Sequence, residues 1–147
     1  MPEMLNRPPE LAAKDECWLP RSVRSPALAR QLLTNLLARV KDGERFADAG
    51  LIVLSELTVN AVMHGSPRGY LIRVCLDVDP DRLRIEVHDA GSAPPEMREV
   101  RADEEAGRGL LLVNSLSGSW GWCPRGDQGI GKVVWSVVPP ARRNGER

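Results

Sequence analysis

Three polar residues, Glu56, Asn60 and His64, recur at intervals of four in an otherwise apolar stretch of the chain. The apolar positions around them have helical spacing, and Gly65 is typical of a helix end. Residues four apart on a helix share one face, so a carboxylate, an amide and an imidazole form a single polar stripe. Such a stripe is either solvated or faces a ligand, because polar groups turned inward need partners.

A second candidate for ligand chemistry is Asp89, which ends an expected strand and has Gly91 two residues on. A carboxylate can accept a hydrogen bond from the amino group of a purine. Glycine lets a flat ring approach the backbone because it has no Cβ. The Asp-x-Gly pattern alone is common, so it indicates a binding site only when other ligand-binding groups accompany it.

A third candidate is Gly107-Arg108-Gly109, which precedes the short apolar helix expected at 110–116. Bare backbone N–H groups at a helix N-terminus bind phosphate, and Arg108 would add positive charge. The same pattern also occurs as a packing turn. Glu56 and Asn60 could then supply a base or oxygen ligands, since magnesium takes one or two protein oxygens together with phosphates and water.

One apparent motif is misleading. The segment from Gly126 to Lys132 fits the first seven positions of a phosphate-binding P-loop, GxxxxGK. The eighth position should be Ser or Thr, and Val133 stands there. A P-loop also runs into a helix, whereas residues 133–138 have a strand pattern. The P-loop interpretation is therefore rejected.

The periodicity along the chain predicts helices and strands in separate blocks. An amphipathic helix is expected to begin with Ser25 as N-cap and Pro26 at the first helical position, and to end near Asp42-Gly43. The helix that carries Glu56 follows it. Alternating residues at 72–78 and 83–88, joined by Asp79-Pro80-Asp81, predict an antiparallel hairpin.

Further strands are expected at 17–19, 119–122 and 130–138. The fold class is therefore α+β, a two-layer sandwich with helices on one face of a mostly antiparallel sheet. His88 falls on the polar face of its strand, where a solvated histidine is expected rather than a ligand. Residues 92–106 lack any period and are expected to form a mobile loop of the kind that covers a site.

Length and composition favour one folded domain at 16–140, between a flexible leader at 1–15 and a flexible basic tail at 141–147. Acidic and basic residues balance at 20 each, which argues against direct binding to nucleic acid or an acidic membrane. No apolar run approaches the roughly 20 residues of a membrane span, and no signal peptide is visible. The three cysteines form no CxxC pair, so neither a disulfide framework nor a zinc site is indicated. A cytoplasmic protein is expected.

In order and spacing, these motifs resemble the GHKL superfamily of histidine kinase-like ATPases. Glu56 to Gly65 resembles its N box, ExxxNAxxHG, while residues 89–94 and 107–110 resemble its two glycine boxes. Within the superfamily, the phrases at 107–113, 120–121 and 131–135 are similar to those of stand-alone anti-sigma-factor serine/threonine kinases. The resemblance covers about residues 16–139.

This resemblance implies a Bergerat fold, with ATP lying between the helices of the sheet under the loop. It implies that Asp89 holds the adenine amine, Asn60 the magnesium ion, and Gly107 and Gly109 the phosphates, with Glu56 as the catalytic base. Gly91 and Arg108 fall within the same boxes. Lys132 could either reach the phosphates or face solvent. The family usually has a threonine after Gly-Lys that supports the aspartate, and Val133 departs from that pattern.

Two functions follow as expectations. The first is an ATP- and Mg²⁺-dependent serine/threonine kinase that binds a sigma factor and phosphorylates an antagonist (anti-anti-sigma) protein, with homodimer formation left open. The alternative is a non-catalytic binding module that retains the ATP-binding fold. A sensor histidine kinase fragment is disfavoured because no histidine precedes residue 44.

Overall fold

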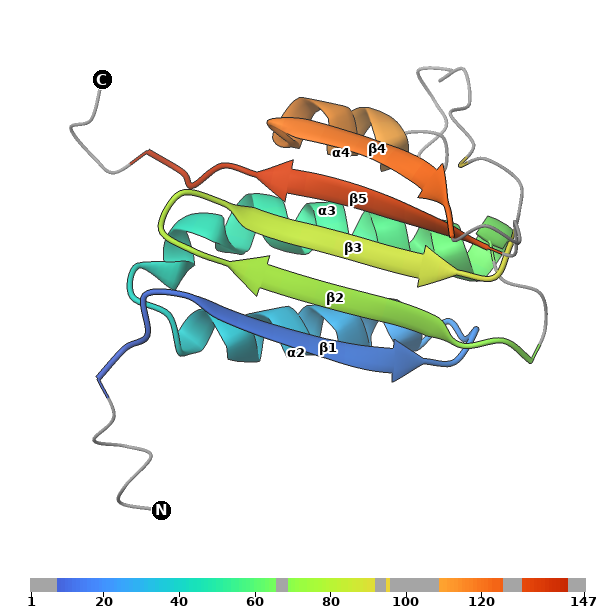
Figure 1. Ribbon diagram of the computed structural model, residues 1–147, viewed down its shortest axis with the longest axis horizontal. Coiled ribbons are helices and arrows are strands. Elements are labelled where there is room, and N and C mark those ends of the chain that lie inside the picture. Colours follow the sequence, from blue (N-terminus) through green and yellow to red (C-terminus); the bar gives the residue numbers. More distant parts are fainter. Residues whose placement is uncertain (1–7, 66–68, 92–94, 96–108, 126–130, 143–147) are drawn as a thin grey trace, which may run out of the picture.

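The computed structural model describes residues 8–65, 69–91, 95, 109–125 and 131–142. Its strands form one antiparallel sheet in the order β1-β2-β3-β5-β4, shown in Figure 1. The strands are β1 (Ala13–Leu19), β2 (Ile72–Val78), β3 (Leu83–Asp89), β4 (Ser119–Pro124) and β5 (Lys132–Val138). The central position of β3 places its C-terminal residue, Asp89, directly opposite the first residue of β5, Lys132.

The helices of the described chain cover one face of this sheet, as Figure 1 shows from the opposite side. They are α2 (Ser25–Ala38), α3 (Ala47–Asn60) and α4 (Gly109–Leu116). Helix α3 lies between α2 and α4 and contacts β3 and β5 beneath it. A 3₁₀ turn, η1 (Gly43–Phe46), precedes α3, and a π-helical turn, η2 (Ala61–Gly65), extends it. The expected α+β two-layer arrangement is confirmed.

The core lies between the helices and the sheet. Every second residue of β2, β3 and β5 is buried, as period-2 alternation requires for a sheet covered on one face. The helices contribute buried Leu33, Leu36, Leu54 and Leu57 to the same cluster. The hairpin turn forms as expected, with the Asp79 Oδ1 accepting from the backbone N–H groups of Asp81 and Arg82 at 2.8 and 2.9 Å.

Two element boundaries and the length of one apolar segment differ from the sequence expectations. Ser25 is the first helical residue rather than the N-cap, because its hydroxyl donates to the Pro20 carbonyl and leaves the helix uncapped by a side chain. Strand β1 begins at Ala13, so residues 13–15 belong to the sheet and not to a flexible leader. Helical structure runs continuously over the 23 residues of Gly43–Gly65, which by length and composition could cross a membrane. Part of this segment, including Val53, Leu54 and Leu57, lies in the domain core.

Candidate functional site

Asp89, at the end of β3, is a charged residue held almost entirely inside the fold, with 1% of its surface exposed. Its Oδ1 accepts a hydrogen bond from the Gly91 backbone N–H at 2.8 Å. The same oxygen lies 3.0 Å from the Lys132 Nζ, whose side chain is also buried. Within the described residues both donors go to Oδ1, so Oδ2 retains its lone pairs for a ligand. A fixed, charged acceptor of this kind can recognise an amino group.

Glycines crowd around this carboxylate. A Cβ added at Gly65 would lie 2.4 Å from the Asp89 Oδ2, and one at Gly91 would lie 1.9 Å from the Gly65 carbonyl oxygen. A Cβ at Gly131, which has φ +86°, would lie 2.3 Å from the Asp89 carbonyl oxygen. Because real side chains could not fit at these distances, the glycines bring the end of η2 and the start of β5 against Asp89. The Asp89 carboxylate therefore stands in a cradle of bare backbone.

Of the two roles open for Lys132, the structure excludes the solvent-facing one. Its side chain is 5% exposed and ion-pairs with Asp89, so it does not face solvent. Val133 points to the opposite, helix-free face of the sheet, where its cross-strand partner is His88. The residue on β5 that supports Asp89 is therefore Lys132. The departure at Val133 leaves Asp89 unaffected, because successive residues of a strand point to opposite faces.

Glu56 lies on α3 where the first residue of α4 approaches it. A Cβ added at Gly109 would come within 2.7 Å of the Glu56 Oε2. Burial raises the pKa of the Glu56 carboxyl above its ordinary value. A helix N-terminus such as the start of α4 presents backbone N–H groups that lack intrahelical partners and a partial positive charge, which suit an anion. A carboxylate and an anion at this position would repel each other, so a cation between them would stabilise both.

Asn60, the last residue of α3, lies one helical turn beyond Glu56 and is half-buried. This places its amide between Glu56 and the glycine cradle along the same helix. The expected alignment with His64 does not continue, because η2 is a wider π-helical turn that changes the angular spacing. The His64 side chain is exposed.

Other predicted site residues cannot be placed. Gly107, Arg108 and nearly all of the expected covering loop at 92–106 lie outside the described residues. The described part of the apparent P-loop is Gly131 and Lys132, and Lys132 begins strand β5 rather than a helix. That observation agrees with rejection of a P-loop. The sequence analysis missed the packing roles of Gly65 and Gly131. Of the two, only Gly131 has a local signal, because glycine is typical of its left-handed backbone conformation.

The fold and the site define a class of protein. The family model of the histidine kinase-like ATPase domain matches residues 19–135, and the chain belongs to this family. The match contains Glu56 and Asn60 of α3, Asp89 at the end of β3 and Gly109 at the start of α4.

A solved structure shares the fold. The chain is similar to the RsbU and RsbW domains of Rv1364c from Mycobacterium tuberculosis, with a TM-score of 0.62 and 18% sequence identity. The alignment covers 89% of this chain and 33% of that chain, so this protein spans about a third of the length of the neighbour. Among curated proteins, no significant sequence match was found.

Proposed function

We propose that this protein binds ATP with Mg²⁺ and works as a regulatory protein of the anti-sigma-factor kinase type. Two observations on the same helix and its extension carry the proposal. Asp89 stands in its glycine cradle beside the end of η2, and Glu56 lies against the α4 N-terminus further back along α3. These groups suit the two ends of one nucleotide. The carboxylate accepts from the adenine amine, and the helix N-terminus receives phosphates.

The donor set also fits magnesium. The Asn60 amide and the Glu56 carboxylate supply hard oxygen atoms beside the position proposed for the phosphates, which is the ligand class that Mg²⁺ prefers. The ion would neutralise phosphate charge and so relieve repulsion with Glu56.

The reaction that follows is phosphoryl transfer to a protein hydroxyl. Glu56 accepts the proton from an incoming serine or threonine, the hydroxyl oxygen bonds to the γ-phosphorus, and ADP leaves. A raised pKa suits a general base, because it lowers the penalty of accepting a proton near neutral pH. The partners proposed are a sigma factor and its antagonist protein, in line with the RsbU and RsbW domains named for the structural neighbour.

A non-catalytic binding module is the second candidate. It is favoured by the solvent-exposed apolar side chains of Ile52, Val59 and Met63 along the Glu56 helix and its extension, which suit protein contact without chemistry. Incubation of the protein with labelled ATP and candidate antagonist proteins separates the two, since only the kinase transfers label.

Asp89→Asn should weaken ATP binding by about 1.5–3 kcal/mol, the range for a hydrogen bond to a charged group. Wild type should reject GTP, because guanine presents a carbonyl where adenine presents its amine. Calorimetry with ATP and GTP on both proteins measures these differences. Equal affinity of wild type for ATP and GTP would remove Asp89 from base recognition.

Asn60→Ala should abolish the magnesium dependence of ATP binding, because it removes the proposed amide ligand of the ion. The protein should stay folded, because the half-buried amide at the end of α3 makes no hydrogen bond among the described residues. Titrations in magnesium and in excess chelator give the comparison. Asn114→Ala, which removes an exposed amide from α4 together with its hydrogen bond from the Trp120 indole, is the matched control. An Asn60→Ala protein with unchanged affinity in magnesium contradicts the assignment.

A further inference from the structure

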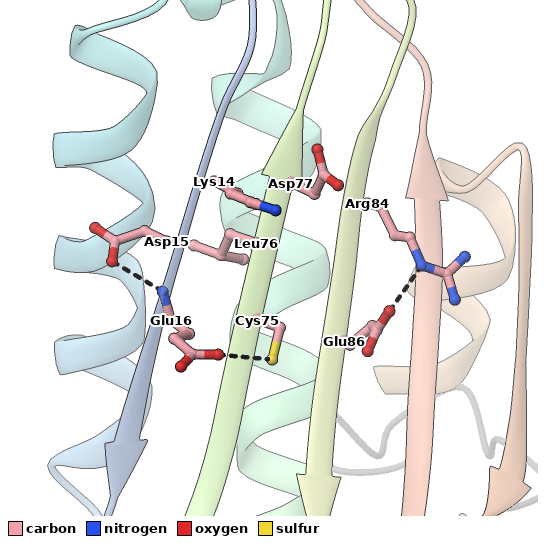
Figure 2. Close-up of a pocket in the computed structure, with 8 residues that line it drawn as sticks. All are labelled: Lys14, Asp15, Glu16, Cys75, Leu76, Asp77, Arg84 and Glu86. Atoms are coloured by element: carbon pink, nitrogen blue, oxygen red, sulfur yellow. Dashed lines mark hydrogen bonds and ion pairs between the residues drawn. The ribbon is translucent and has the colours of Figure 1, made fainter.

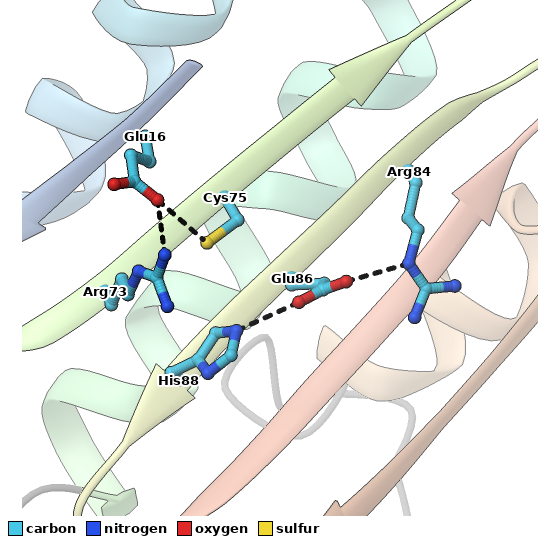
Figure 3. A network of polar contacts seen from close by, with 6 residues as sticks. All are labelled: Glu16, Arg73, Cys75, Arg84, Glu86 and His88. Carbon is cyan, nitrogen blue, oxygen red and sulfur yellow. Dashed lines mark hydrogen bonds and ion pairs between the residues drawn. The ribbon is translucent and has the colours of Figure 1, made fainter. Parts of the chain in front are cut away.

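On the helix-free face of the sheet, three side chains of different chemistry meet: Cys75 from β2, and Glu86 and His88 from β3 (Figure 3). One ligand atom from each, the thiol sulfur, a carboxylate oxygen and a ring nitrogen, lies within 4.8 Å of the other two. Cys75 and Glu86 are direct cross-strand partners, and His88 is two residues further on the same face. This separates the cluster from the Asp89 site, which faces the helices.

His88 is not the solvated histidine that the sequence suggested. Its side chain is 13% exposed, and its Nε2 lies 2.9 Å from the Glu86 Oε1. Tetrahedral zinc bonds to sulfur, nitrogen and oxygen would place the ligand atoms roughly 3.3–3.6 Å apart. The His88–Glu86 contact of 2.9 Å must lengthen slightly, and the widest separation, which is at most 4.8 Å, must shorten by at most about 1.2 Å. Small rotamer adjustments on rigid strands can provide this change.

A fourth donor is within reach on the neighbouring strand. Glu16 of β1 lies opposite Cys75, and the Cys75 thiol donates to its Oε2 at 3.8 Å. Glu16, Cys75 and Glu86 also line a shallow hollow of about 490 Å³ on this face (Figure 2). The hollow gives an ion or its bound water access to the cluster from solvent.

Two arginines balance the negative charges of Glu16 and Glu86, without any contribution from the Cys75 thiol. The guanidinium of Arg73 pairs with Glu16, and that of Arg84 pairs with the Glu86 Oε2 at 2.9 Å, which leaves the Glu86 Oε1 toward His88. Each arginine can therefore stay on its glutamate as an outer partner of a ligand. Burial raises the pKa of the Cys75 thiol, so a metal ion must displace that proton and gains a thiolate in return.

We propose that Cys75, Glu86 and His88 form a binding site for a zinc-class divalent cation, with Glu16 as the nearest fourth donor. A sulfur and an imidazole nitrogen favour zinc over magnesium or calcium, which prefer oxygen alone. The absence of a CxxC pair hid this site from the sequence, because its ligands come from different strands. Since His88 precedes Asp89, the bound ion would also fix the strand end that carries Asp89.

The test uses the full chain stripped of metal, without nucleotide, so that its outcome does not depend on ATP binding. Zn²⁺ is titrated in competition with a chromophoric chelator of micromolar affinity. We expect one equivalent to bind, and Cys75→Ser and His88→Gln each to weaken binding by about 10²-fold or more. Cys123→Ser, which removes an exposed thiol on β4, should leave the affinity unchanged.

Co²⁺ added to wild type gives a second measurement that needs no variant. A thiolate–cobalt charge-transfer band at one equivalent is expected, and it should vanish in Cys75→Ser. Failure of wild type to compete with the chelator, or absence of the band, overturns the proposal. So does an equal loss of zinc affinity in Cys123→Ser, since the binding would then depend on thiols in general.

Discussion

Lys132→Met should lower the free energy of unfolding by about 3–5 kcal/mol, the range for removing one partner of a buried ion pair. The ammonium and the Asp89 carboxylate lie 3.0 Å apart, with 5% and 1% of their side chains exposed. Methionine has similar length and fills the space, so the expected loss comes from leaving the Asp89 carboxylate buried without its cation. Urea denaturation, analysed at constant slope, measures the change.

Two further variants isolate the cause. Adding Asp89→Asn to Lys132→Met removes the uncompensated charge and should recover much of the lost stability, since coupled sites are non-additive. Arg39→Met removes the ion-pair contacts of a half-exposed guanidinium with Glu10 and Asp15, each 3.9 Å long. It should lower the free energy of unfolding by no more than about 1 kcal/mol. A double variant as unstable as the sum of its two single changes would mean that the charges of Lys132 and Asp89 do not interact.

The ion pair also has a consequence for recognition. Lys132 and the Gly91 N–H both hold Oδ1, which fixes the plane of the carboxylate and directs Oδ2 toward the Gly65 side of the cradle. An acceptor fixed in this way loses little conformational entropy when a ligand binds. Under the proposed function, the same lysine that pairs with Asp89 in the fold would also hold the carboxylate ready for a purine amine.

The main elements of the fold were predictable because each has a strong local signal. Alternation in β2 and β3, the Asp79 turn and the helical spacing around Leu33 and Leu54 all agree with the tertiary structure. Ser25 failed as a cap because its hydroxyl had a competing acceptor, the Pro20 carbonyl, which no local pattern reveals. The start of β1 was missed because its polar residues alternate on an exposed edge strand.

The sequence suggested the candidate site residues but not how they pair. Asp89, Glu56 and Gly109 were proposed from their types and order, whereas the contact between Lys132 and Asp89 depends on the register of β3 with β5. The register also decides that Val133 turns away, and a shift of one residue would exchange the two roles. The approach of Gly65 to Asp89 joins segments 24 residues apart and has no sequence signal of its own.

The choice between kinase and binding module now depends on Glu56. Val133 no longer argues against nucleotide binding, because the residue that supports Asp89 is present as Lys132. Because burial raises the pKa of Glu56, ionisation of this half-buried carboxyl lowers the stability of the fold. A binding module has no use for such a group, whereas a kinase requires it as the general base.

Glu56→Gln should transfer phosphate about 10²–10⁴-fold more slowly than wild type and bind ATP nearly as well, because general-base help of that size is lost while the other contacts remain. The transfer rate of wild type should fall as the pH drops through the raised pKa of Glu56, since the base must be ionised, and the variant should lack this dependence. Because the folded-state pKa is raised, ionisation costs stability as the pH rises, so glutamine should fold at least as stably at neutral pH. Single-turnover transfer of labelled phosphate to the antagonist protein measures the rate.

Asp48→Asn, which neutralises an exposed carboxylate in the first turn of the same helix, is the matched control and should retain the wild-type rate and pH profile. Loss of ATP binding in Glu56→Gln would make Glu56 a structural residue that holds α3 against Gly109. A wild-type protein that transfers no phosphate to any antagonist, together with a Glu56→Gln protein that binds a sigma factor equally well, would establish the binding module instead. The two functions thus differ in what one carboxylate does, and the rate, the affinity and the pH profile of a single substitution separate them.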